Sequence, residues 1–140
     1  MAKAKLRHIA FAVNDLERSA LFYENAFGLE RVRQSDVAIM MTDGVMSVAL
    51  LHLPTNNNTE QDERGRDFIG LHHVGFLVDD LDATCSAVEH NGGAYHGQIH
   101  NVGKGPETER KYRDPDGIIF DMVIPEHATT VWRVPIDAAP

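Results

Sequence analysis

The sequence has little cysteine and no long apolar runs, and each of these features excludes a class of protein. The single cysteine, Cys85, excludes a framework of disulfides within the chain, and at an apolar helix position it is interpreted as an inert core thiol. No apolar run approaches the ~20 residues that a bilayer-spanning helix needs, so no membrane partner is expected. The basic start at residues 1–7 is not followed by an apolar signal segment, which predicts a cytoplasmic protein.

Basic residues are also scarce. Lys and Arg number 13 against 21 Asp and Glu, for a net charge of −8 at pH 7. Binding to nucleic acid requires clustered positive charge that neutralises phosphates, so no nucleic-acid partner is expected. A hydrophobic content of 43% is sufficient for a packed core. The eight histidines exceed what packing requires, and their positions therefore matter.

The chain contains an internal repeat. The segment 71–81 reads as a buried strand that leads directly into a helix, and the segment 6–16 matches it after a shift of 65 residues. The shift superimposes His73 on His8, Phe76 on Phe11 and Gly93 on Gly28, without a gap. One structural unit is therefore used twice, with a histidine at the same place on the first strand of each copy.

Each copy is predicted to fold as βαβββ. The first has a strand over 6–13, a helix with Asn14 as N-cap and Gly28 at its end, and strands over about 29–34, 37–41 and 45–53. The second has a strand over 71–78, a helix that opens at 79–82 and stops at 91–93, and strands over 94–100, 108–113 and 118–124. The predicted organisation is an α+β fold with module 1 at 1–53, a polar linker at 54–69, module 2 at 70–125 and a C-terminal tail at 126–140 without obvious regular structure.

Three residues in this pattern suggest a metal site. By strand alternation, His8 shares its face with two alanines and His73 shares its face with Gly75, which indicates a cavity wall. Asp121 lies in the last strand among apolar residues, where a carboxylate is costly unless it is paired or bound to a metal. Two imidazoles and one carboxylate form a compact divalent-metal site with open positions.

The same residues carry a resemblance to a known family. The carriers are 8–19 with Phe22 and Tyr23, and the stretch from His73 onward with 114–117 and Asp121. They resemble the vicinal oxygen chelate superfamily, which includes glyoxalase I, extradiol dioxygenases, fosfomycin-resistance enzymes, methylmalonyl-CoA epimerase and bleomycin-resistance proteins. The resemblance covers residues 6–125 and implies a cupped, half-open barrel-like mixed sheet, a homodimer, and a site within one chain or shared between swapped modules.

The resemblance also implies the ligands and the cofactor. His8, His73 and Asp121 correspond to the metal ligands, with Asp121 where Glu is usual. The implied cofactor is one divalent ion per site, which is iron, zinc, nickel, cobalt or manganese.

The first module departs from the glyoxalase I pattern, which has a carboxylate ligand on the last strand of that module. The matching position here is Val48 or Leu50, depending on hairpin register, and neither side chain binds metal. His52 shares the strand face by parity and is a fourth ligand, a substrate contact or a strand-end residue. The resulting three-ligand set is similar to that of fosfomycin-resistance enzymes and extradiol dioxygenases. The chain lacks an obvious counterpart of the acid/base histidine of ring-cleaving members, and Lys111 stands where their site tyrosine does.

Other polar residues are candidates for proton transfer. Glu109 and Tyr112 lie on the penultimate strand, and His100 lies on a preceding strand. We expect the proton carrier to be His52, Glu109, Tyr112 or His100, in this order of preference. His72 is expected on the face opposite to His73, in a structural role.

The implied function is that of a metal-dependent enzyme with glyoxalase-like isomerase or lyase chemistry. Its partner would be a small-molecule substrate that chelates the metal through two neighbouring oxygens, with the metal as Lewis acid. Two alternatives are an Fe(II)-dependent, extradiol-type dioxygenase and a metal-free small-molecule binding or resistance protein.

Overall fold

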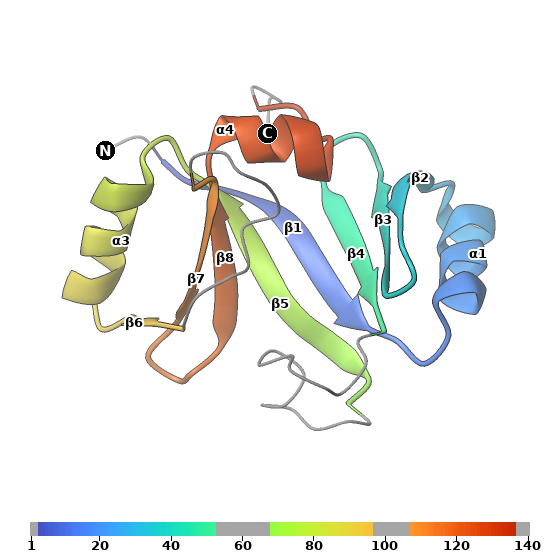
Figure 1. The fold of residues 1–140 in the computed structure, drawn as a ribbon, viewed down its shortest axis with the longest axis horizontal. Coiled ribbons are helices and arrows are strands. Elements are labelled where there is room, and N and C mark those ends of the chain that lie inside the picture. Colours follow the sequence, from blue (N-terminus) through green and yellow to red (C-terminus); the bar gives the residue numbers. More distant parts are fainter. Residues whose placement is uncertain (1–2, 53–67, 97–106, 137–140) are drawn as a thin grey trace.

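A computed structural model describes residues 3–52, 68–96 and 107–136. It has an α+β fold built on one 8-stranded mixed sheet with strand order β2-β3-β4-β1-β5-β8-β7-β6 (Figure 1). The first half comprises β1 (Lys5–Ala12), α1 (Leu16–Phe27), β2 (Glu30–Gln34), β3 (Ala38–Thr42) and β4 (Ser47–Leu51). The second half comprises β5 (Gly70–Leu77), α3 (Leu81–His90), β6 (Ala94–Tyr95), β7 (Glu109–Arg113) and β8 (Ile119–Val123). The predicted fold class, with two βαβββ units, is confirmed.

The strand order is symmetric about the junction of β1 and β5. These two strands pair antiparallel, and each pairs in parallel with the last strand of its own half, β1 with β4 and β5 with β8. The strands that carry His8 and His73 are therefore neighbours at the centre of the sheet. The repeat seen in the sequence corresponds to a repeat in the topology.

The two helices begin with the same capping device. Asp15 and Asp80 are the N-caps, and their carboxylates accept hydrogen bonds from the backbone N–H groups of Arg18 (2.9 Å) and Ala83 (3.0 Å). The N-cap of α1 is thus Asp15, one residue after the predicted Asn14. Gly28 ends α1 with a φ of 72°, a left-handed conformation that glycine adopts without steric cost.

The helices cover one face of the sheet and the C-terminal segment covers the other. Buried residues of α1 and α3 pack on β3, β4, β7 and β8 in two apolar clusters. The predicted irregular tail instead forms α4 (Pro125–His127) and a π-helical turn, η1 (Ala128–Trp132), and in Figure 1 this segment lies at the top, above the central strands and between α3 and α1. Trp132 packs there against Leu77 and Val123. Among the described residues, no helix is long and apolar enough to cross a membrane.

Candidate metal centre

The three predicted ligands come from three adjacent strands. His8 of β1 lies opposite Gly75 of β5, and Gly75 lies opposite Asp121 of β8. His73 precedes Gly75 by two residues and therefore shares its face of the sheet. Cross-strand pairing and alternation together direct all three side chains to the face away from α1 and α3.

These three side chains form one buried cluster. Their candidate ligand atoms lie within 4.8 Å of one another, and each residue is at most 5% exposed. His73 Nε2 is 3.0 Å from Asp121 Oδ2. Two ligands about 2.1 Å from one ion at a right angle are about 3 Å apart, so this spacing suits shared coordination. Two imidazole nitrogens and a carboxylate oxygen are also a donor set that divalent transition metals bind, so the residues fit a metal ion.

His8 is held as a neutral imidazole. Its Nδ1 lies 2.9 Å from Ser47 Oγ, which leaves the other ring nitrogen available as a ligand. Burial lowers the pKa of His8 to about 3, although the charge of Asp121 opposes this shift. The ring is therefore uncharged at neutral pH, as metal binding requires.

Asp121 is held as an ionised carboxylate. Burial alone would raise its pKa, but the charge of Lys111 and the interactions with His73 hold the pKa well below its usual value. The Lys111 ammonium donates to Oδ1, while Oδ2 faces His73. Lys111 is directly opposite Asp121 on β7 and is itself buried. One oxygen of Asp121 is thus directed toward the histidines and the other is occupied by a lysine.

His72 contacts His73, contrary to the prediction that the two rings lie on opposite faces. The two Nδ1 atoms are 2.8 Å apart and His72 is buried. The pairing of β1 with β5 shifts register at this point, since Ala10 pairs with His73 but Phe11 pairs with Leu71. His72 is the extra residue of this β-bulge, and a bulge interrupts the simple alternation of side chains.

A chain of polar contacts continues from Asp121 toward the C-terminal segment. Lys111 Nζ is 3.5 Å from Glu109 Oε1, and Glu109 Oε2 is 3.4 Å from His127 Nε2. Burial lowers the pKa of His127 to about 4, so its ring is also neutral at neutral pH. The other ring nitrogen of His127 lies 3.1 Å from Thr108 Oγ1.

The four candidate proton carriers have different surroundings. Glu109 adjoins the cluster through Lys111, with a side chain 21% exposed. Tyr112 points to the opposite face, where its hydroxyl donates to Glu89 Oε1 (2.7 Å) among residues that pack on α3. His52 is exposed and its Nδ1 contacts the carbonyl of Val13 (3.0 Å), so it does not join the cluster. His100 lies outside the described residues.

The strand pairing also shows which residue of the first half is equivalent to Asp121. Asp121 lies opposite Gly75 on β5, and the residue opposite the equivalent position of β1 is Ala49. The predicted positions, Val48 and Leu50, instead pack in the cluster beneath α1. The hairpin register decides this assignment, and the sequence alone did not fix it.

Sequence reasoning placed Lys111 only at the position of a site tyrosine and did not identify its contact with Asp121, and it missed three other residues near the cluster: Ser47, His127 and Trp132. Lys111 carried one usable signal, since a lysine between arginine and tyrosine in a strand that alternates into the core is unusual. The other three become neighbours of the site only through long-range packing.

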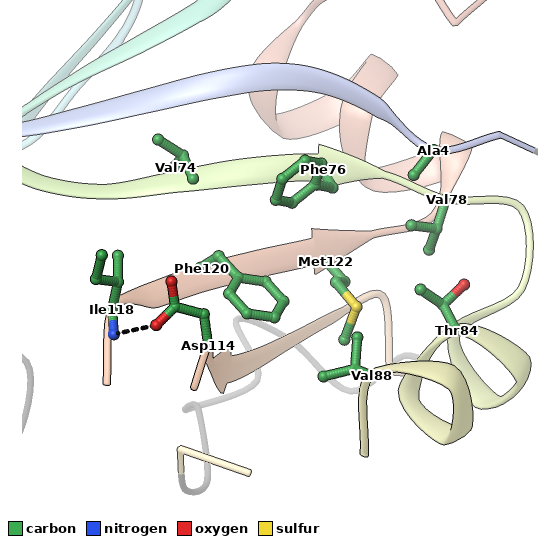
Figure 2. Close-up of a pocket in the computed structure, with 10 residues that line it drawn as sticks. All are labelled: Ala4, Val74, Phe76, Val78, Thr84, Val88, Asp114, Ile118, Phe120 and Met122. Atoms are coloured by element: carbon green, nitrogen blue, oxygen red, sulfur yellow. Dashed lines mark hydrogen bonds between the residues drawn. The ribbon is translucent and has the colours of Figure 1, made fainter. Parts of the chain in front are cut away.

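A cavity of about 400 Å³ lies on the other face of the sheet, between β5, β8 and α3 (Figure 2). Its wall is formed by residues that alternate with the candidate ligands, including Val74, Phe76, Phe120 and Met122. The Asp114 carboxylate at its edge accepts a hydrogen bond from the backbone of Ile118 (3.0 Å). This apolar cavity is separated from the His8, His73 and Asp121 cluster by the sheet itself.

Comparisons with known proteins agree with this architecture. The chain is 28% identical over 126 residues to a lactoylglutathione lyase of Haemophilus influenzae, covering 85% of this chain and 91% of the relative. Its fold is similar to that of a hypothetical protein of Bacillus halodurans, with a TM-score of 0.71, 17% identity and coverage of 88% and 95% of the two chains. It is also similar in fold to methylmalonyl-CoA epimerase of Mycobacterium tuberculosis, with a TM-score of 0.65, 19% identity and coverage of 86% and 87%.

Most of the chain matches the model of one protein family. Residues 5–122 match the family described as the Glyoxalase/Bleomycin resistance protein/Dioxygenase superfamily. This range includes both βαβββ units except the last residue of β8, and it includes all three candidate ligands. The chain therefore belongs to the glyoxalase, bleomycin resistance protein and dioxygenase superfamily.

Proposed function

We propose that this protein is a divalent-metal-dependent enzyme of the lyase or isomerase type. It would act on a small substrate that binds the metal through two neighbouring oxygens. The observation that carries the proposal is the buried cluster of His8, His73 and Asp121, with ligand atoms within 4.8 Å of one another. The similarity to lactoylglutathione lyases, over nearly the full length of both chains, supports the lyase class.

In this proposal, His8, His73 and Asp121 hold the metal. A bound divalent ion would supply Lewis acidity that stabilises negative charge on substrate oxygens. Ser47 would orient His8 through the contact at Nδ1, and Lys111 would orient Asp121 through Oδ1. Because Asp121 is ionised and His8 is neutral, these residues need no change of protonation before a metal binds at neutral pH.

We favour Glu109 as the proton carrier. Its carboxylate is partly exposed and lies next to Lys111 on the face of the candidate site. A carboxylate in this position would accept a substrate proton at one oxygen and return it. His127, at 3.4 Å from Oε2, would hold the other end of the carboxylate. The homodimer implied by the family resemblance belongs to the same proposal.

The decisive test is elemental analysis of the protein purified without chelator or nickel-affinity resin. We expect near-stoichiometric zinc, nickel, cobalt or manganese in the wild type and loss of most of it in His73→Ala. The matched control is His52→Ala, which removes an exposed histidine outside the cluster and should keep its metal.

The other outcomes separate the alternatives. Iron that is lost in His73→Ala, together with oxygen uptake in substrate screens, would favour the Fe(II) dioxygenase. No metal, even after reconstitution with each ion, would refute both enzyme hypotheses and leave the metal-free binding protein.

A further inference from the structure

We propose that Trp132 is a positioning residue of the metal centre. Its indole, at the end of the C-terminal turn Ala128–Trp132, fixes the plane of the His8 imidazole. This inference rests on the proposed function, because it assigns a role relative to the metal that His8 would bind.

The contact between the two rings is close and nearly parallel. The ring centroids of His8 and Trp132 are 4.6 Å apart and their planes differ by 5°. His8 is 3% exposed and Trp132 is 2% exposed, so water does not separate or screen the rings. Stacked aromatic pairs of this kind attract beyond the burial of their area, and the flat contact opposes tilting of the imidazole.

The stack complements the hydrogen bond between His8 Nδ1 and Ser47 Oγ. The Ser47 contact at Nδ1 (2.9 Å) acts in the plane of the imidazole, and Trp132 restrains the ring from one side of that plane. Together the two contacts fix the orientation of the imidazole, so its second ring nitrogen points in a single direction. Contacts of this kind, made to a metal ligand by its neighbours, raise metal affinity because the ring is already ordered before the ion binds.

Gly75 provides the space in which the indole lies. A Cβ atom at this position would be 2.8 Å from Trp132 Cη2 and 2.8 Å from His8 Cβ, closer than real Cβ contacts. The small-residue face that the sequence suggested as a cavity wall is therefore filled at Gly75 by a side chain from the tail. This arrangement links the tail directly to the row His8, Gly75 and Asp121.

The indole is itself rigidly held. Trp132 shares an apolar cluster with Leu77, Val123, Ala128 and Val134. After the turn, the backbone N–H of Val134 donates to the carbonyl of Ala128 (3.0 Å) and closes the segment on itself. A ring anchored in this way can hold its neighbour in place.

The test compares three variants for metal affinity, measured by competition with a chromophoric chelator for Zn²⁺ and Co²⁺. Trp132→Leu keeps an apolar side chain but loses the flat ring, and its dissociation constant should rise on the order of tenfold. Trp132→Phe keeps a ring and should restore affinity to near the wild-type value. Val131→Ala alters the same turn beside the same cluster and should leave affinity unchanged.

The outcomes distinguish this inference from the proposed function. If the wild type binds neither ion, the proposed metal centre is wrong. If the wild type binds and a folded Trp132→Leu binds equally well, the metal centre stands and the role of Trp132 is refuted. Equal weakening in Trp132→Phe and Trp132→Leu would also refute it, because stacking by a ring would then not matter.

A second readout does not depend on any variant of Trp132 being folded. Trp132 is the only tryptophan in the chain, so its fluorescence reports this one position. Stoichiometric Co²⁺ should quench the emission of the wild type, and Zn²⁺ should change it, because the ion would bind the imidazole on which the indole stacks. His73→Ala should show neither response. Binding of Co²⁺ to the wild type without any change in emission would contradict the proposed stack.

Discussion

At the scale of single residues, the most unusual feature of the candidate site is its lysine. Lys111 is 5% exposed and donates to Asp121, which is 3% exposed. Without a metal, Asp121 is satisfied by Lys111 at one oxygen and by His73 at the other. The ammonium therefore balances a charge that the protein would otherwise bury alone.

We predict that Lys111→Met strongly destabilises the metal-free protein. The variant leaves Asp121 as a buried carboxylate without its cation, and breaking a buried pair in this way costs about 3–5 kcal/mol. The free energy of unfolding, measured by urea denaturation in chelator, should fall by about that amount.

The neighbouring Arg110 offers a matched control for this variant. It lies on the same strand and pairs with Asp82 and Glu107, but its partners are largely exposed. Arg110→Met should therefore cost less than about 1 kcal/mol from the loss of these ion pairs. If both variants lose a similar free energy of unfolding, the buried Lys111–Asp121 pair stabilises the protein no more than an exposed ion pair does.

At the scale of elements, strand alternation predicted most of the site and failed where the strand is irregular. His8 and His73 lie on the expected face, because His8 pairs with Gly75 and alternation over residues 73–75 keeps His73 on the same face as Gly75. His72 was misplaced because a β-bulge adds one residue to β5, and nothing in the local pattern of apolar residues marks that insertion. Likewise, the register of β4 on β1, which makes Ala49 the first-half equivalent of Asp121, depends on pairing across the sheet.

The packing of the C-terminal turn on β5 leads to a prediction about Gly75. Gly75→Ala adds a methyl group where no space exists, and overpacking of this kind costs about 1–3 kcal/mol. Urea denaturation should show this loss in the wild-type background.

A double variant tests whether Trp132 causes that loss. In Trp132→Leu the added Cβ no longer meets the indole, so Gly75→Ala should cost less there than in the wild type. Equal costs in both backgrounds would show that the indole does not occupy the space beside Gly75. The free energy of unfolding is measured for both single variants and for the double variant, so the comparison gives the energy of the contact between the two positions.

At the scale of the whole molecule, two similar halves produce one asymmetric site. The repeat predicted the two βαβββ units, because local sequence patterns determine the elements and the shift determines their equivalence, while the central position of β1 and β5 is seen only in the structure. The asymmetry comes from residues that have no similar residue at the equivalent position of the other half. Lys111 and Asp121 have no charged counterparts opposite each other in the first half, where Met40 faces Ala49. Trp132 and His127 come from a segment that follows both halves.

Because this segment contains the buried His127, the free energy of unfolding should depend on pH. The pKa of His127 is lowered from 6.5 to about 4 by burial, with Lys111 and Arg33 acting in the same direction and Asp121 opposing them. Between these values the unfolded chain binds a proton that the folded chain does not. The free energy of unfolding is therefore fully maintained above pH 6.5 and falls as the pH drops toward 4, by on the order of 2–3 kcal/mol for this residue.

We predict that His127→Gln reduces this acid dependence. Gln can keep a polar contact with Glu109 but cannot take up a proton in this range. Unfolding by urea at several pH values between 6.5 and 4 should therefore give a shallower decline than in the wild type, with a remaining slope to which the buried His8 contributes. The exposed His52→Gln is the control and should follow the wild type. An unchanged slope in His127→Gln would show that His127 takes up its proton in the folded protein as readily as in the unfolded chain, and that its burial beside Glu109 imposes no penalty on the charged ring.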